Sequence, residues 1–260
     1  MLNIINKTAK FRIFRKDPKA GTMARHDEFD VPVEEGMSVL DGVNYVVEHL
    51  DSTISVRWNC KAARCGSCAA EINNYPRLMC KTRVSDIGDI ITVNPMRAFP
   101  LVKDLVTDVS SNFETDKGIP EFKPSGNAAE PWKIYDIDVG RSQEFRKCIE
   151  CFLCMDVCHV VREHNSRYIG PRHVVKAAAL DMHPMDTLDR SELLTREKGL
   201  GYCNVTKCCQ EVCPEHINIT DNAIIPEKER AADKLYDPVL MLIDKLKELG
   251  KGEKDEHEPT

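Results

Sequence analysis

The sequence has no long apolar run. No stretch of its 260 residues approaches the roughly 18 consecutive apolar residues that a membrane-spanning helix needs. The N-terminal stretch MLNIINKTAKFRIFRKD also contains no apolar core of signal-peptide length. The sequence therefore predicts a protein that is neither exported nor membrane-spanning. Any work at a membrane would require another chain to hold it there.

The sequence also lacks a net positive charge and recognisable catalytic motifs. The formal net charge is −6, which gives no reason to expect nucleic acid as a partner. The sequence contains no Gly-rich phosphate loop, no G-x-G-x-x-G after a predicted strand, and no recognisable nucleophile–base pair. The chain therefore offers no recognisable site for making or breaking bonds.

Cysteine, in contrast, is abundant. The composition is otherwise ordinary for a globular protein, with 42% hydrophobic and 30% charged residues, but the chain has 12 cysteines. Disulfides are disfavoured in a protein that stays in the reducing cytosol. Metal ligation is therefore the better use for these thiols.

Two halves of different character are expected. Residues 10–110 are predicted to be mixed α/β. KFRIFR, EFDVPV and DIITV have strand patterns, and the apolar residues between Ser38 and Leu50 have helical spacing with Ser38 as the N-cap. Residues 140–250 are predicted to be helical. There SQEFRKCIECFLCMDVC lacks Pro and Gly, Pro171 suits a first helical turn, and DPVLMLIDKLKEL is an amphipathic helix expected to pack on the domain surface.

The connection between the halves is rich in Pro, Gly and Lys over residues 112–134. A chain of this length suggests about two domains. The predicted segments are a mixed α/β domain over 1–115, a linker over 116–139, a helical domain over 140–250 and a disordered tail over 251–260.

The first cysteine group has the spacing C-x4-C-x2-C with a fourth cysteine 12 residues later, which is typical of plant-type [2Fe–2S] ferredoxins. Its members are Cys60, Cys65, Cys68 and Cys80. The first three are expected in a tight loop, and the fourth is expected to return after a short hairpin. Gly66 lets the backbone approach the sulfides, and small neighbours leave amides free to bond sulfur. Zinc is the alternative, but zinc usually takes two C-x2-C-like pairs.

The second group has the spacing C-x2-C-x2-C-x3-C. Its members are Cys148, Cys151, Cys154 and Cys158. In bacterial ferredoxins three cysteines of such a run bind one cubane, and the fourth binds the other cluster. The run therefore predicts a partner group downstream. His159 stands where a proline usually follows the run.

The stretch CNVTKCCQEVCP is that partner group. Cys203, Cys209 and Cys213 fall on the ferredoxin frame, but Thr206 stands where the second cysteine should be. By the same crossover rule, Cys213 completes the first cubane and Cys158 joins the other two at the second site. A hydroxyl is a poor ligand for a soft iron site. Since a cubane tends to lose an unligated iron, the sequence predicts a [3Fe–4S] cluster.

Several neighbouring side chains have open roles. Cys208 could be a fourth ligand, but it lies one residue off the frame and is expected to point elsewhere as a small buried thiol.

Five histidines near the cysteines are expected to be ordinary surface or hydrogen-bonded residues: His159, His164, His173, His183 and His216. Six basic residues around the first group could tune the cluster potential, form a docking face, or simply be solvated: Arg57, Lys61, Arg64, Arg77, Lys81 and Arg83.

Three clusters in joined domains suit the transfer of single electrons in series. The potentials of such clusters run from roughly −700 to +450 mV. A two-electron donor at one end and a quinone at the other would fit this relay. A single zinc ion takes only about four ligands, so it does not account for the matched cysteines of the second half.

With these groups in this order, roughly residues 10–245 resemble the iron–sulfur subunits of succinate dehydrogenase and fumarate reductase. The resemblance implies a β-grasp plant-type ferredoxin domain followed by an all-α bacterial-ferredoxin-like domain. It assigns the [2Fe–2S] ligands to Cys60, Cys65, Cys68 and Cys80, the [4Fe–4S] ligands to Cys148, Cys151, Cys154 and Cys213, and the [3Fe–4S] ligands to Cys158, Cys203 and Cys209.

The resemblance also implies partners. In this family a flavoprotein subunit with covalent FAD oxidises succinate or reduces fumarate near the [2Fe–2S] end. Membrane-anchor subunits, some of which carry haem, hold quinone near the [3Fe–4S] end. The implied location is the cytoplasmic face of the cell membrane, with a place in the respiratory chain and the tricarboxylic acid cycle. RSQEFRKCIECFLC, GYCNVTKCC and CPEHI look more like members that work with menaquinone.

The sequence departs from ubiquinone-using members at two positions. Many of these have a tryptophan five residues after the cysteine matching Cys158 and a histidine directly after the one matching Cys203. This chain has Glu163 and Asn204 there, so no quinone-site residue is transferred.

Two rivals remain. One is the electron-transfer subunit of a heterodisulfide-reductase-like or thiol-dependent fumarate-reducing complex, which usually adds CCG repeats that are missing here. The other is a zinc-stabilised interaction module, which would be colourless where a cluster protein is brown.

Overall fold

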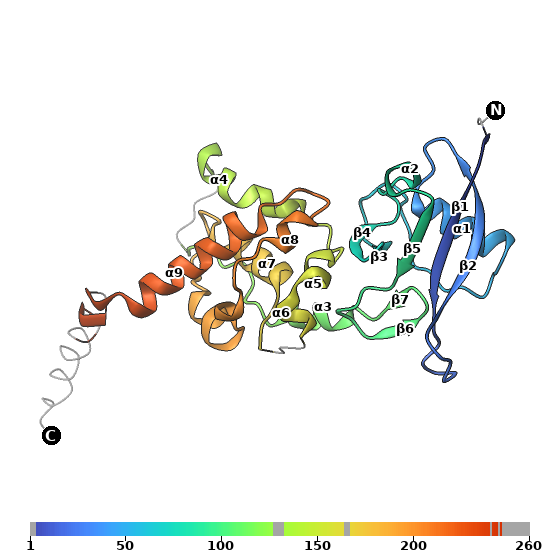
Figure 1. Cartoon of the computed structure of the whole chain (residues 1–260). Helices are drawn as coiled ribbons and strands as arrows, with labels where there is room; N and C mark the ends of the chain where they lie inside the picture. The colour runs from blue at the N-terminus through green and yellow to red at the C-terminus, as the bar shows by residue number, and fades with distance from the viewer. Residues whose placement is uncertain (1–3, 127–132, 164–166, 240, 244, 246–260) are drawn as a thin grey trace, which may run out of the picture.

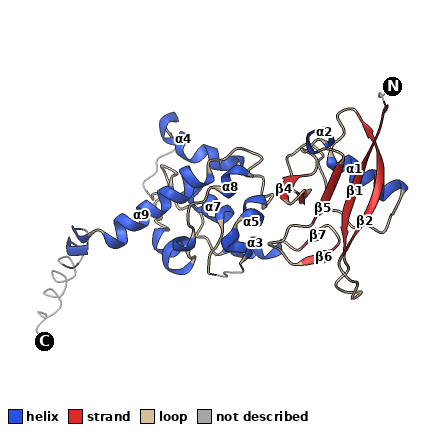
Figure 2. Cartoon of the chain, in the orientation of Figure 1, coloured by secondary structure: helices blue, strands red, loops and turns tan. Residues whose placement is uncertain are grey.

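Two lobes make up the part of the chain that the structure describes. The computed structural model describes residues 4–126, 133–163, 167–239, 241–243 and 245. One lobe is built around a β-sheet and the other is helical, and they lie end to end (Figure 1, Figure 2), which confirms the predicted α+β fold class. No helix within these ranges is long and apolar enough to span a membrane. Pro131, His164 and the predicted tail over 251–260 lie outside the described residues.

A mixed five-stranded sheet forms the N-terminal lobe, with the strand order β2-β1-β5-β3-β4. The central β1–β5 pair is parallel, and the other pairs are antiparallel. The strands are β1 (Ile4–Arg15), β2 (Arg25–Glu34), β3 (Ala69–Ile72), β4 (Tyr75–Leu78) and β5 (Ile90–Asn94). The strands predicted at KFRIFR, EFDVPV and DIITV lie in β1, β2 and β5. The parallel pair at the centre is the β-grasp arrangement that the resemblance implied.

Helix α1 (Val39–His49) packs on this sheet, close to the helix predicted from apolar spacing. Ser38 is its N-cap and forms a capping box with Asp41, as the sequence predicted for Ser38. A Cβ on Gly42 would lie 2.1 Å from the ring of Phe11 in β1, so this glycine lets the helix lie close to the sheet. The short helix α2 (Val84–Ile87) leads into β5.

The β3–β4 hairpin returns the chain to the first cysteine group. Asn73 and Asn74, the two turn residues, have φ of 50° and 63°, as a type I′ turn requires. The amide of Met79 then donates to the carbonyl of Cys68 at 3.1 Å. The predicted hairpin before Cys80 is therefore confirmed.

The connection between the lobes contains regular structure and contacts the C-terminal lobe. A small hairpin of β6 (Leu101–Lys103) and β7 (Val106–Thr107) leads into α3 (Ser110–Lys117). Beyond α3, the Arg190 guanidinium donates to the carbonyls of Pro120 and Glu121 at 2.8 and 2.9 Å. The described part of this segment is therefore held on the C-terminal lobe.

The C-terminal lobe contains short helical elements joined by turns. The α-helices are α4 (Asp136–Gln143), α5 (Leu153–Val157), α6 (His159–Arg162), α7 (Pro171–Asp181), α8 (Cys208–Glu211) and α9 (Ile225–Tyr236). The 3-10 and π segments are η1 (Glu144–Lys147), η2 (Leu193–Glu197), η3 (Leu200–Tyr202) and η4 (Ile219–Ile224). Pro171 opens α7 at its first turn, as predicted.

The helix expected across SQEFRKCIECFLCMDVC is not continuous. η1 ends at Lys147, and α5 begins only at Leu153. Between them, Glu150 and Phe152 have left-handed backbones with φ of 55° and 61°. The absence of Pro and Gly was misleading, because Glu150 and Phe152 leave the right-handed helical region and turn the cysteines inward.

The prediction for DPVLMLIDKLKEL is wrong in its described part. Figure 1 shows the described residues 237–239 and 241–243, which follow α9, lying away from the rest of the lobe. Val239, Met241 and Leu242 have exposed fractions of 62%, 51% and 59%. These side chains do not pack on the surface of the chain itself.

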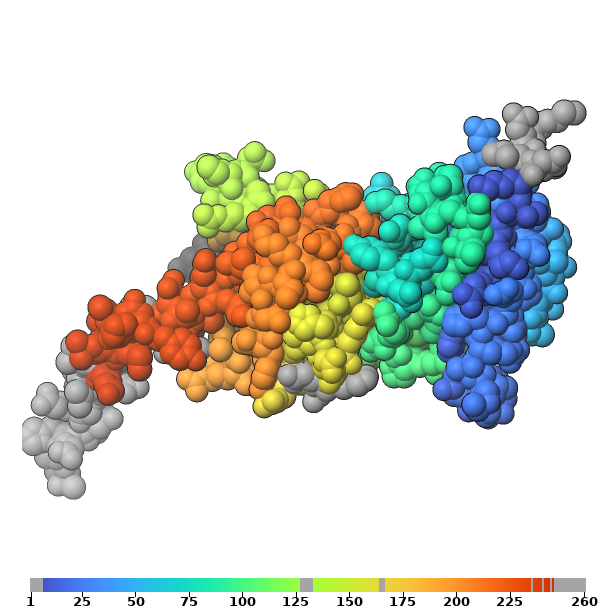
Figure 3. All heavy atoms as spheres, in the orientation of Figure 1, coloured from blue at the N-terminus to red at the C-terminus, as the bar shows by residue number. Residues whose placement is uncertain are grey.

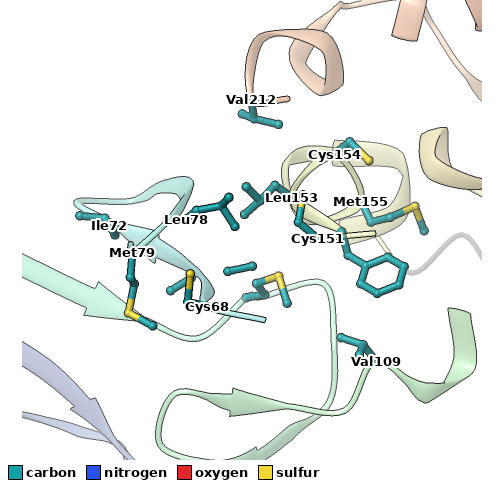
Figure 4. Packing of buried hydrophobic residues seen from close by; sticks show 14 of the residues in the cluster. Cys68, Ile72, Leu78, Met79, Val109, Cys151, Leu153, Cys154, Met155 and Val212 are labelled. Atoms are coloured by element: carbon teal, nitrogen blue, oxygen red, sulfur yellow. The ribbon is translucent and has the colours of Figure 1, made fainter. Parts of the chain in front are cut away.

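The two lobes share one hydrophobic core. Buried residues form a single cluster that runs from the sheet into the helices. In Figure 4, Leu78 of β4 lies next to Leu153 of α5, and the space-filling view in Figure 3 shows the lobes packed against each other. Because this contact is apolar and buried, it fixes how the cysteine groups of the two lobes face each other.

Candidate metal-cluster sites

The loop of the first group turns its backbone amides toward sulfur. The N–H groups of Ala62 and Arg64 each donate to Cys60 Sγ at 3.3 Å. The Cys60 N–H donates to Cys65 Sγ at 3.5 Å. Lys61 in this loop has a left-handed backbone with φ of 54°, which helps to fold the amides inward. Such amide donors stabilise thiolates that carry the charge of an iron–sulfur cluster.

The thiols of this group have very different proton affinities. Burial opposes ionisation of Cys65, but hydrogen bonds from Cys60 and Ser67 outweigh it and lower its pKa to about 6. Burial raises the pKa of Cys68 to about 12, and the neighbouring Cys80 thiol adds to the rise. A buried thiol of this kind ionises only with a cation beside it, which an iron centre supplies.

Gly66 brings the first group into contact with the second. A Cβ on this residue would lie 2.6 Å from the Cα and 2.9 Å from the Cβ of Cys151. Its φ of +67° also disfavours any other residue. The sequence predicted that Gly66 permits close approach to sulfide. The structure adds a close approach to the backbone of the other lobe.

Four cysteines of the C-terminal lobe line one cavity. These are Cys148, Cys151, Cys154 and Cys213, the set predicted for the first cubane. Arg172 also lines this cavity. Burial raises the pKa of Cys151 to about 12 and raises that of Cys154 well above its ordinary value, and the neighbouring thiols add to both rises. Arg172 partly offsets the rise at Cys148 through its positive charge.

The two cysteine loops of this lobe repeat one backbone conformation. Glu150 and Phe152 follow Cys148 with φ of 55° and 61°, and Val205 and Lys207 follow Cys203 at the same offsets with φ of 61° and 63°. Helix α5 begins directly after Phe152, as α8 does after Lys207. Thr206 lies three residues after Cys203, just as Cys151 lies three residues after Cys148, so Thr206 occupies the position of Cys151 in the first loop. The threonine is therefore a replacement within an intact cluster loop.

A second cavity of this lobe contains the remaining cysteines. Cys158, Cys203 and Cys209 line it together with Thr206, as predicted for the [3Fe–4S] site. Burial raises the pKa of Cys209 to about 12. Its Sγ lies 3.4 Å from Thr220 Oγ1, a contact that lowers the pKa in part.

The expectation that Cys208 points away from this site is wrong. Cys208 also lines the cavity, and its Sγ lies 3.4 Å from Thr206 Oγ1. The left-handed Lys207 starts α8 at Cys208, which turns both Cys208 and Cys209 toward the cavity. Within the described residues, no group of three or more His, Cys, Asp or Glu side chains is placed to hold a single metal ion.

Three residues of these cavities carried no signal in the sequence. Tyr168 and Thr220 line the cavity of Cys158, and Arg172 lines the other. Tyr168 and Arg172 lie around the start of α7, far along the chain from Cys203 and Cys213. Only the fold brings these segments together, so no spacing rule could have found them.

The basic and histidine residues make varied contacts. Arg57 donates to the Ser67 carbonyl at 3.2 Å, and Lys81 donates across the lobes to the Pro214 carbonyl at 2.7 Å. Lys61 lies 4.7 Å above the Trp58 ring. A docking role for this basic set stays a prediction.

His173 fits the expectation of a hydrogen-bonded histidine. It is buried in α7, and its two ring nitrogens lie 2.8 Å from Asp116 Oδ1 and 3.3 Å from Asn112 Oδ1. These contacts tie α7 to α3.

Comparison with known families gives two matches. A family described as a 2Fe-2S iron-sulfur cluster binding domain matches residues 10–114. A family described as a 4Fe-4S dicluster domain matches residues 144–217. The three cysteine groups lie within these ranges, which confirms the prediction of a [2Fe–2S] cluster followed by two larger clusters.

Whole-chain relatives have the same order of domains. The fumarate reductase iron-sulfur subunit of Escherichia coli O6:H1 is 30% identical over 218 residues, which cover 82% of this chain and 88% of that protein. A chain of the Mycobacterium smegmatis Sdh1 complex in the apo form is 52% identical, with a TM-score of 0.86, and the match covers 90% of this chain and 99% of that one. A subunit of the fumarate reductase (CoM/CoB) of Methanothermobacter marburgensis is 30% identical, but only 43% of that protein is covered.

Proposed function

We propose that this chain, which belongs to the family of iron–sulfur subunits of fumarate reductase and succinate dehydrogenase, relays single electrons between the FAD of a flavoprotein subunit and a quinone at a membrane-anchor subunit. The chain is thus an electron-transfer subunit of an oxidoreductase complex. The single observation that supports the relay is that eleven cysteines lie in three groups of neighbouring thiols, in two lobes joined through one buried interface.

The proposed ligands follow the three groups. A [2Fe–2S] cluster is bound by Cys60, Cys65, Cys68 and Cys80, a [4Fe–4S] cluster by Cys148, Cys151, Cys154 and Cys213, and a [3Fe–4S] cluster by Cys158, Cys203 and Cys209. The last cluster type is typical of this family. The residues fit these groups because buried thiols with raised pKa values need a cation to ionise, and because loop amides already point at sulfur.

When bound, the clusters accept and donate one electron at a time. The residues of the chain hold the thiolates, exclude water and fix the separations. Leu153 and Leu78 close the junction between the lobes with apolar side chains. Gly66 allows the first loop to lie against Cys151, so that the first and second sites are adjacent.

The two ends of the relay differ in exposure. Cys60 is exposed, which supports contact between the first site and the flavoprotein subunit. At the other end, the apolar residues Val239, Met241 and Leu242 are uncovered, which supports contact with an apolar partner such as an anchor subunit. We place the complex on the cytoplasmic face of the cell membrane, and menaquinone remains the favoured quinone from the sequence resemblance. Glu163 and Asn204 leave the quinone-site residues unassigned.

A second candidate is the corresponding subunit of a thiol-dependent fumarate reductase. The 30% identity to the Methanothermobacter marburgensis protein favours it. The match spans less than half of that protein, whereas it spans nearly all of the Escherichia coli and Mycobacterium smegmatis chains. Purifying the native complex, identifying its co-eluting chains and assaying succinate oxidation and fumarate reduction with a quinone or with thiols separates the two.

The iron content tests the role of Thr206. In the wild-type chain we expect a three-iron EPR signal after oxidation. Thr206→Cys should add a fourth thiolate at the position that Cys151 occupies in the other loop, so the signal should be replaced by that of a four-iron cluster.

Cys208→Ala is the matched control, since Cys208 lines the same cavity. The three-iron signal should persist in this variant. Eight irons in the C-terminal lobe of the wild type, falling to seven in Cys208→Ala, would show that Cys208 is a ligand and would refute the Thr206 argument.

A further inference from the structure

Tyr168 places an unpaired hydroxyl in the interior of the C-terminal lobe. The residue is 5% exposed, and its hydroxyl has no hydrogen-bonding partner of sound geometry within the described part of the chain. The amide of the next residue, Ile169, donates to the Lys198 carbonyl at 2.9 Å, which holds the backbone in place. A buried hydroxyl without a partner destabilises the fold, so a group that accepts its hydrogen bond is expected at this site.

The side chain lines the cavity proposed for the [3Fe–4S] cluster. Cys158, Cys203 and Cys209 line the same cavity. A phenol is a hydrogen-bond donor, and here it lies in a cavity beside groups that become negative sulfur when they bind iron.

The two cavities of this lobe differ in this respect. Hydroxyl side chains of Tyr168, Thr206 and Thr220 line the terminal cavity. The described residues that line the [4Fe–4S] cavity include no hydroxyl side chain, and there Arg172 supplies positive charge instead. The fold therefore gives the terminal site a set of neutral donors that the middle site does not have.

We propose that the Tyr168 hydroxyl donates a hydrogen bond to sulfur at the terminal site, either Cys203 Sγ or a sulfide held beside it, and thereby raises the reduction potential of that site. This inference rests on the proposed [3Fe–4S] ligand set. The reduced cluster carries more negative charge on its sulfur, so a donor stabilises it more than the oxidised cluster. Tyr168 is therefore a tuning residue that favours electron flow toward the terminal site.

The test is a redox titration of the purified complex, monitored by EPR, for the wild type and Tyr168→Phe. The substitution keeps the ring and removes only the hydroxyl. At a fixed potential, we expect the ratio of oxidised to reduced three-iron centre to rise about three- to tenfold. This is the effect expected for the loss of one hydrogen bond. For a one-electron couple this is a fall of roughly 30–60 mV. The midpoints of the other two clusters should stay unchanged.

Tyr202→Phe is the matched control. Tyr202 is next to Cys203 in sequence, but its side chain is 40% exposed and its ring lies 4.6 Å from the Arg167 guanidinium carbon. Removing its hydroxyl should leave the three midpoints unchanged. A similar fall in Tyr202→Phe, or an equal shift of every cluster in Tyr168→Phe, would contradict a specific role for Tyr168.

Two outcomes separate this inference from the function on which it rests. A wild-type three-iron signal whose midpoint does not move in Tyr168→Phe overturns the inference alone. A wild type without any three-iron signal overturns the proposed ligand set and the inference with it. If Tyr168→Phe loses the cluster, ENDOR of the wild-type protein with ring-deuterated tyrosine decides. Ring deuterons coupled to the three-iron centre, together with a strongly coupled proton that disappears in D2O, would support the hydrogen bond. The absence of either signal would refute it.

Discussion

Individual backbone conformations decide which thiols meet in this protein. Glu150 and Phe152 leave the right-handed region in one loop, and Val205 and Lys207 do so in the other. None of these four is glycine, so each conformation carries a cost that the surrounding packing must offset. Because the two loops share this geometry, Thr206 is the position at which the second loop lacks a cysteine that the first loop has.

Gly66 allows the sharpest test at this scale. In Gly66→Ala the new Cβ would meet Cys151 Cα at 2.6 Å, so the first loop must move away from the second site. We expect weaker magnetic coupling between the reduced [2Fe–2S] and [4Fe–4S] clusters and several-fold slower electron transfer between them. EPR relaxation and rapid-freeze reduction measure these quantities.

Gly21→Ala controls for backbone strain. Gly21 has the same φ of +67°, but a Cβ there would meet nothing within 4 Å. Both variants should lose about 1–2 kcal/mol from the left-handed backbone. Equal coupling in the two variants would contradict a steric role for Gly66.

At the scale of elements, α9 is held on the lobe by an unusual group of charges. Glu227 in its first turn is fully buried, and neither carboxylate oxygen has a hydrogen-bonding partner among the described residues. Burial, together with the nearby Asp181 carboxylate, raises the pKa of Glu227 to about 7, although the positive charge of Arg230 opposes the rise. Asp181 itself is paired with the buried Arg190 at 2.5 Å. The docking of α9 should therefore depend on pH.

The sign of this dependence follows from proton binding. Between the ordinary pKa of 4.5 and the folded value of about 7, the folded chain keeps a proton that the unfolded chain releases. Stability should therefore fall as pH rises through this window. Glu227→Gln removes the effect, and we expect it to stabilise the protein at pH 8 by on the order of 1–3 kcal/mol, with little change at pH 5. Thermal unfolding at both pH values measures this.

Glu229→Gln is the control, because Glu229 lies exposed on the same helix. It should change the unfolding temperature little at either pH. If Glu227→Gln is no more stable than the wild type at pH 8, the raised pKa is wrong.

At the scale of the whole molecule, a buried charge network joins the two lobes. Glu71 of β3 accepts hydrogen bonds from Arg97 at 2.7 Å and from Arg162 of α6 at 2.6 Å. Asp156 of α5 accepts from the amide of Ala98 at 3.0 Å. Together with the Lys81 contact to Pro214, these bonds hold the lobes in one orientation. A relay needs this rigidity, because electron transfer depends on a constant separation between sites.

Glu71→Gln tests the network. The substitution leaves two arginines without their buried anion, and we expect a loss of about 1–3 kcal/mol, less than for a fully buried pair because both arginines are partly exposed. The thermal unfolding temperature should fall, and the segment between the lobes should become easier to cleave by protease.

Glu114→Gln is the matched control. Glu114 pairs with Lys117 at 2.8 Å, but both side chains are more than 70% exposed. A surface pair of this kind contributes about 0–1 kcal/mol. An unfolding temperature that falls equally in both variants would mean that Glu71 does not hold the lobes together.

The fold could be predicted where a pattern is local. Alternation gave β1, β2 and β5, Ser38 gave the start of α1, and Pro171 gave the start of α7. The helical structure expected over SQEFRKCIECFLCMDVC is interrupted, because the absence of Pro and Gly does not reveal that Glu150 and Phe152 have left-handed backbones. The packing expected after α9 failed, because amphipathic spacing does not tell which surface covers the apolar face.

By itself, the sequence determined which thiols belong together, since ligand spacing within a tight loop is a property of the local chain. It also determined that one cysteine frame has a hydroxyl in place of a thiol, because Thr206 stands where the frame requires its second cysteine. Only the tertiary structure decided what surrounds these sites. Tyr168 reaches the terminal cavity and Gly66 lies against Cys151 because segments far apart in the chain pack into one core, and no short-range pattern encodes such contacts.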